Sequence, residues 1–93
     1  MPLSKQQIRK LRARAHHLKP VVWLGQQGLS DAVMGEVGIA LDAHELIKIK
    51  LAGMDKTQRQ AAATRIAEHS GGEIVQQIGQ MLVLYRARPD AYS

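Results

Sequence analysis

In the segment Val21-Val-Trp-Leu-Gly-Gln-Gln-Gly-Leu-Ser30, an apolar run leads through a loop into a helix start. The apolar residues 21–24 predict a short buried strand. Gly25 and Gly28 bracket the loop, and Ser30 has the side chain of a helix N-cap. A strand followed at once by a helix is half of a strand–helix–strand unit, so this stretch predicts an α/β arrangement.

Upstream of this stretch, the sequence predicts a helix over about residues 4–17. Ser4 and Gln7 have the spacing of a capping box at its start. Pro20 ends the segment, because proline disfavours a helical conformation at the residue before it. The helix has one narrow apolar stripe, made by Ile8, Leu11, Ala15 and Leu18.

Downstream, helical and alternating patterns predict a helix from Ser30 to about residue 43, a strand over 45–52, a helix over about 56–69, and strands over 73–78 and 81–86. Gly79-Gln80 forms a two-residue hairpin turn between the last two strands. The order is therefore α-β-α-β-α-β-β. Right-handed crossovers place the second and third helices on one sheet face, so we expect a two-layer sandwich with a mixed four-stranded sheet. The 93 residues form a single domain, 1–93, with a frayed tail over 89–93.

Positive charge is concentrated at the N-terminus. The net charge of the chain is +5, and residues 1–20 contain no acidic residue. They carry six basic residues, Lys5, Arg9, Lys10, Arg12, Arg14 and Lys19. Such a concentrated positive field suits a polyanion such as nucleic acid, although a solvated helix face that confers solubility is an equal alternative. The apolar stripe is too narrow for a membrane-surface helix, and we expect no membrane partner.

Several function classes find no support in the sequence. There are no cysteines, so disulfides, thiolate metal sites and a cysteine nucleophile are excluded, and a reducing, cytoplasmic location fits. The four histidines lack metal-ligand spacing, and no nucleotide-binding glycine loop is present. We therefore expect no catalytic residues, no metal and no cofactor. The low aromatic content also counts against a sheet that stacks bases in the manner of an RNA-recognition motif.

The Gly25-Gln26-Gln27-Gly28 loop is the strongest candidate for a binding site. A helix start presents unpaired N–H groups that attract phosphate, and glycines let a sugar–phosphate backbone approach closely, as in the G-x-x-G loop of KH domains. A plain structural turn remains nearly as good an interpretation. The same pattern recurs at Gly35–Gly38 inside the second helix, where we expect the glycines to allow close helix packing.

Four other side chains allow two interpretations each. We favour a core position for Trp23 over base stacking, because its neighbours in the expected strand are apolar. Tyr85 suits packing at the sheet edge or a stacking platform. Lys48 and Lys50 are most simply the solvated face of an edge strand, although they can also extend a positive path.

Five motifs in order resemble the CRM domain (chloroplast RNA splicing and ribosome maturation), and the length resembles its stand-alone bacterial YhbY-type members. They are Leu18-Lys-Pro-Val-Val22, Gly25-Gln-Gln-Gly-Leu-Ser30, Glu45-Leu-Ile-Lys-Ile-Lys50, Gly71-Gly72 and Gln77-Ile-Gly-Gln-Met-Leu-Val-Leu-Tyr-Arg86. The resemblance implies a fold similar to the C-terminal domain of translation initiation factor three. It also implies RNA binding without catalysis, on precursors of the large ribosomal subunit. One departure is that two glutamines stand between the loop glycines, where the family often has a basic or small residue.

We therefore expect a non-catalytic, monomeric protein that binds ribosomal RNA through a basic helix and a KH-like loop, with ribosomal proteins as further partners. The alternatives are a protein-interaction module on ribosomal particles and a generic nucleic-acid backbone binder. The expected RNA-binding residues are Lys5, Arg9, Lys10, Arg12, Arg14, Lys19, Gly25, Gln26, Gln27, Gly28, Ser30, Lys48, Lys50 and Arg86.

Overall fold

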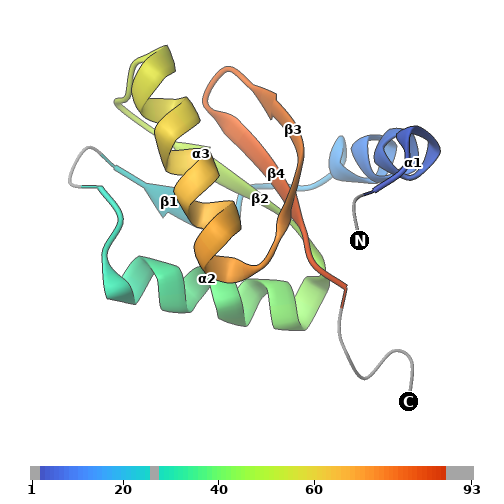
Figure 1. Cartoon of the computed structure of the whole chain (residues 1–93), viewed down its shortest axis with the longest axis horizontal. Helices are drawn as coiled ribbons and strands as arrows, with labels where there is room; N and C mark the ends of the chain where they lie inside the picture. The colour runs from blue at the N-terminus through green and yellow to red at the C-terminus, as the bar shows by residue number, and fades with distance from the viewer. Residues whose placement is uncertain (1–2, 26–27, 88–93) are drawn as a thin grey trace.

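The expected order of helices and strands is confirmed in a computed structural model that describes residues 3–25 and 28–87 (Figure 1). Gln26, Gln27 and the predicted tail over 89–93 lie outside the described residues. The elements are α1 (Lys5–Ala15), β1 (Val22–Leu24), α2 (Asp31–His44), β2 (Leu46–Leu51), α3 (Lys56–Ser70), β3 (Glu73–Ile78) and β4 (Met81–Tyr85).

The helices begin where their capping residues predict. The Ser4 hydroxyl accepts a hydrogen bond from the Gln7 N–H at 3.1 Å, and the Gln7 side chain accepts one from the Ser4 N–H at 2.8 Å. Asp55 and Gln58 form the same reciprocal pair at the start of α3. These contacts satisfy backbone donors that have no partner within the helix, so each start is defined locally by the sequence.

The four strands form a mixed sheet in the order β1-β2-β4-β3. β1 is parallel to β2, while β4 runs antiparallel to both of its neighbours, β2 and β3. The expectation that Lys48 and Lys50 lie on an edge strand is wrong, because β2 pairs with β1 on one side and with β4 on the other. The two lysines are instead on a central strand, and their side chains are half-buried.

The main core lies between the sheet and the pair α2 and α3. The expected placement of these two helices on one sheet face is confirmed. The cluster comprises Val22, Leu24, Val37, Leu41, Ile47, Ile49, Leu51, Ala62, Ala63, Ile66, Leu82 and Leu84. Gly72 follows the end of α3 at a close approach, since a Cβ there would lie 2.9 Å from Cγ of the buried Leu84. A glycine is therefore required where the chain passes from α3 into β3.

The opposite sheet face carries α1, which the sequence pattern did not place. Leu11 and Ala15 of α1 are buried against Leu46, Val75 and Val83 of the sheet, with Leu3, Ile8 and Tyr85 packed around them. The Leu3 N–H also donates to the Glu73 carboxylate at 3.0 Å. This second core has fewer buried residues than the first, because α1 covers only part of the sheet face on which it lies.

The expectation that Trp23 is a core residue is wrong, because its side chain is 62% exposed. Successive residues of a strand point to opposite faces, and Val22 and Leu24 take the two positions that face the main core. The expectation for Gly35 and Gly38 is also wrong. A Cβ at either position would meet no atom within 4 Å, so these glycines serve no close helix packing.

Candidate nucleic-acid interface

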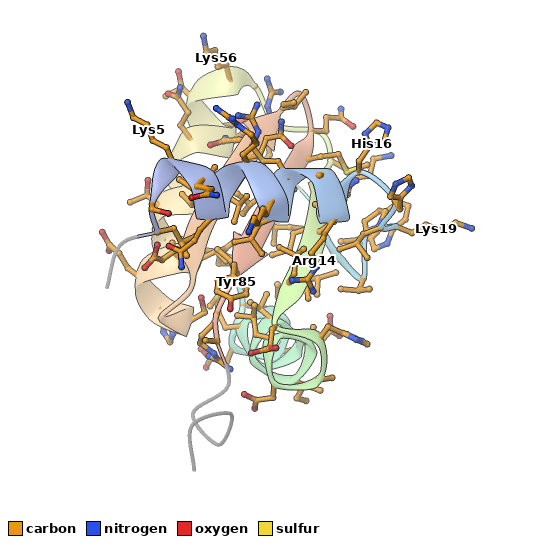
Figure 2. The ribbon with its side chains drawn as sticks, turned by 90° about the vertical axis from the view of Figure 1, so that its right-hand side faces the viewer. Lys5, Arg14, His16, Lys19, Lys56 and Tyr85 are labelled. Atoms are coloured by element: carbon orange, nitrogen blue, oxygen red, sulfur yellow. The ribbon has the colours of Figure 1, made fainter. Side chains whose placement is uncertain are left out.

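The basic side chains of α1 lie on two sides of the helix. Residues at spacings of three and four share a side, which groups Lys5, Arg9, Arg12 and His16 on one side and Lys10 and Arg14 on the other. All six are exposed. In Figure 2, α1 crosses the front of the sheet with Lys5 and His16 above it and with Arg14 and Tyr85 below it. We call the first group the hairpin flank and the second the Tyr85 flank.

The hairpin flank faces β3, β4 and the turn between them. Nη2 and Nε of Arg12 lie 3.1 and 3.2 Å from the Gln76 side-chain amide, whose oxygen accepts from both when it faces the guanidinium. His16 lines a hollow with Lys48, Gln76, Ile78 and Met81. Arg12 therefore helps to hold α1 on the sheet, and Lys5 and Arg9 on the same flank are exposed.

The Tyr85 flank faces the start of β3 and the end of β4. Lys10 and Arg14 line a hollow with Tyr85, Glu73 and Arg86. Tyr85 is half-buried and packs against the cluster beneath α1, so of the two interpretations of this ring the structure favours packing. Glu73 contributes one negative charge to this hollow, beside the cations of Lys10, Arg14 and Arg86.

Lys19, Lys48 and Lys50 continue the positive surface beyond the end of α1. Lys19 is exposed and lines a hollow with Arg14, Leu18, Val21 and Lys48. Lys50 pairs with Trp23 across β1 and β2, and its Nζ lies 5.0 Å from the centre of the indole ring. None of α1, β1, β2 and β4 contains an acidic residue, and β3 contributes Glu73. The sheet face that carries α1 is therefore strongly cationic.

The glycine loop connects β1 to α2. The Gly28 N–H donates to the Gly25 carbonyl at 3.1 Å, and Gly28 has a φ of 85°, a conformation that favours glycine. Ser30 has its expected N-cap role, since its hydroxyl accepts from the Val33 N–H at 3.2 Å. The carboxylate of Asp31 lies in the first turn of α2, where it competes with a phosphate for the positive helix end.

The structure does not bring α1 and this loop together. Figure 1 shows the end of β1 and the start of α2 on the opposite side of the molecule from α1. The cation beside the loop is Arg65 of α3, which the sequence analysis missed. Arg65 is exposed and lines one hollow with Leu29 and Ser30 and another with Leu24 and Gly28. The crossover rule places α3 beside α2, but it does not say which residue of α3 reaches the loop.

Arg86 lines the same hollow as Lys10 and Arg14 but uses its guanidinium within the fold. Nη1 donates to the Ser70 carbonyl at 2.6 Å, and Nη2 donates to the Gly38 carbonyl at 3.3 Å. Nη2 also forms an ion pair with Asp42 at 2.6 Å. These bonds tie the end of β4 to α2 and to the end of α3, so we leave Arg86 out of the proposed interface.

The fold and the cationic face define a small α/β domain of a type already seen in a solved structure. That structure, in solution, is of a Staphylococcus aureus protein proposed to bind RNA. It matches with a TM-score of 0.82 and 30% sequence identity, over 92% of this chain and 90% of that one.

The chain belongs to the CRS1/YhbY (CRM) domain family, whose model matches residues 3–86. It is 45% identical to a protein of Haemophilus influenzae named "RNA-binding protein", over 96% of this chain and 90% of that one. A Pseudomonas aeruginosa protein named "Probable RNA-binding protein" is 38% identical, over 96% and 86% of the two chains. Bacillus subtilis YqeI, with the same description, is 34% identical, over 90% and 88%. Within residues 3–25 and 28–87, no helix has the length and apolarity to cross a membrane.

Proposed function

We propose that this protein binds RNA and catalyses no reaction. The observation that carries the proposal is the sheet face that bears α1, where cations gather on α1 and β2 and the acidic residue beside α1 is Glu73 of β3. A surface of this kind attracts the phosphate backbone of a nucleic acid through release of counterions. Family membership and the names of three relatives support RNA as the polyanion.

The specific RNA that we propose is ribosomal RNA in precursors of the large ribosomal subunit, bound in the cytoplasm by a monomer of this single-domain protein. This step rests on the resemblance to stand-alone CRM proteins that associate with such precursors. Ribosomal proteins would then be neighbours on the same RNA. The protein would act by holding or shielding an RNA segment during assembly.

In the proposed mode of binding, the cations of α1, Lys19 and the sheet lysines neutralise phosphates. The 25–28 loop with Arg65 contacts a second backbone segment on the other side of the molecule. Contacts of this kind position an RNA but read no base edges, so the protein recognises shape and backbone more than sequence. Because the two sites are separated, a single compact phosphate group cannot occupy both, and the bound RNA must extend between them.

The test is to recover the tagged protein from its native cells at moderate salt and to sequence the RNA that accompanies it, with and without RNase. Enrichment of large-subunit ribosomal RNA, with loss of its proteins on RNase treatment, is the expected result. RNA of every class in proportion to its abundance would reduce the function to generic backbone binding. Protein partners that survive RNase would support a protein-interaction module instead.

A further inference from the structure

Trp23 is exposed on the cationic face of the sheet although it is the single tryptophan of the chain. An aromatic side chain of this size contributes most to stability when it is buried. Its side chain instead projects from the middle of β1, with the ammonium of Lys50 over the ring at 5.0 Å from its centre. Its position is therefore poorly explained by folding and suits a ligand.

Trp23 begins a row of four residues that crosses the whole sheet. The register pairs Trp23 with Lys50, Lys50 with Met81, and Met81 with Ile78. Residues paired in this way point to the same face. Ile78 is 61% exposed, Met81 and Lys50 are half-buried, and α1 is packed over other residues of this face. We call this the cross-strand row.

The positive charge around the cross-strand row indicates which kind of ligand binds there. Lys48 lies on the same face two residues before Lys50, and His16 lines the hollow that Lys48 shares with Met81 and Ile78. An apolar protein segment would match the indole and the isoleucine but gain nothing from the lysines. A nucleotide matches both, because its base offers a flat π surface to the indole and its phosphate an anion to the lysines. A base within a duplex is already stacked, so only an unpaired one can lie flat on the ring.

We infer that Trp23 stacks an unpaired base of single-stranded RNA on the ring face that Lys50 does not cover, and that Lys50 contacts the attached phosphate. This inference rests on the proposed RNA binding and adds that the bound RNA contains an unpaired nucleotide. The site lies on β1, between the end of α1 and the glycine loop along the chain. It therefore provides a contact on the path that an RNA must take between the two separated sites.

The single tryptophan makes the test direct, since fluorescence excited at a wavelength that tyrosine does not absorb reports on Trp23 alone. The protein is titrated with a short single-stranded oligonucleotide, with the same sequence as a duplex, and with an abasic strand of equal length and charge. Binding is followed in parallel by the anisotropy of a label on the RNA. We expect the single strand to quench the tryptophan along the same curve that anisotropy reports, and the abasic strand to bind without quenching.

Variants supply the second readout. Trp23→Leu should weaken single-strand binding by about 5- to 150-fold, the range that stacking of one base contributes, while Trp23→Phe keeps most of the affinity. Ile39→Ala is the matched control, because Ile39 is 71% exposed on α2 and outside the cross-strand row. It should bind as the unmodified protein does.

Two results would overturn the stacking inference and leave the proposed function standing. One is RNA binding by anisotropy with unchanged tryptophan fluorescence and full affinity of Trp23→Leu. The other is equal quenching by the abasic strand, which would assign the signal to a phosphate that displaces Lys50. Absence of binding to every RNA would instead overturn the proposed function itself.

Discussion

Neutralising the two flanks of α1 separately should show which side of the helix faces the RNA. The pair Lys5→Gln with Arg9→Gln removes two charges from the hairpin flank, and Lys10→Gln with Arg14→Gln removes two from the Tyr85 flank. Glutamine has nearly the same helix propensity as lysine and arginine, so neither pair should unfold α1. We leave Arg12 unchanged, because its contact with Gln76 helps to hold α1 on the sheet.

The hairpin-flank pair should have the larger effect, since this flank leads to the cross-strand row and the other one faces Glu73. If each of the two side chains neutralises one phosphate, the slope of log affinity against log salt should fall by about 1.4 to 1.8. At about 0.15 M salt the affinity should then drop about 15- to 30-fold, since a contact that acts through counterion release contributes little near 1 M salt.

The assay is fluorescence anisotropy of a labelled RNA over a series of salt concentrations, with circular dichroism melts of both variants as the folding control. Because both pairs remove the same net charge, the long-range field falls equally in the two variants. Equal slopes for the two pairs would refute the assignment of the hairpin flank. Unchanged slopes in both would remove α1 from the interface.

Three further predictions concern single positions. Arg65→Gln should lower the salt slope by about 0.7 to 0.9 if the loop seats a phosphate, and an unchanged slope would leave Gly28 and Ser30 with a structural role. Gly35→Ala should raise the free energy of unfolding, measured by urea titration, by about 0.5 to 1 kcal/mol. The added methyl group meets no neighbour, and alanine favours the helix more than glycine does. A loss of stability would contradict this prediction. Arg86→Ala should lower the free energy of unfolding by about 1 to 3 kcal/mol, because the Ser70 and Gly38 carbonyls lose the hydrogen bonds that Arg86 donates. The salt slope of RNA binding should not change. A changed slope would return Arg86 to the interface.

Features that depend on a few neighbouring residues could be predicted from the sequence. Ser4, Ser30 and Asp55 each cap the helix that they precede, and Gly79-Gln80 forms the turn between β3 and β4. Each of these depends on hydrogen bonds or dihedral angles within four residues. The second and third helices lie on one face because crossovers between parallel strands have a fixed hand.

Features that depend on tertiary packing could not be predicted in the same way. Val21 to Leu24 are all apolar, so no alternation shows that Trp23 points away from the main core. The narrow stripe of α1 indicates that it packs on something, but not on which sheet face. The distance between α1 and the glycine loop follows from that face. The approach of Arg65 to Gly28 depends instead on how α3 packs beside α2.

The two faces of the sheet have different energetic roles, which bears on how the protein can bind RNA. The core between the sheet and the pair α2 and α3 contains twelve buried residues, whereas the core between the sheet and α1 contains five. Stability therefore depends mainly on the first face, and the second can leave Trp23 and Ile78 exposed at little cost to the fold. Substitution of an exposed residue on the second face should change binding with little change in the melt. Binding and folding can thus be measured apart on this face, which makes Trp23 and the hairpin flank direct tests of the proposed interface.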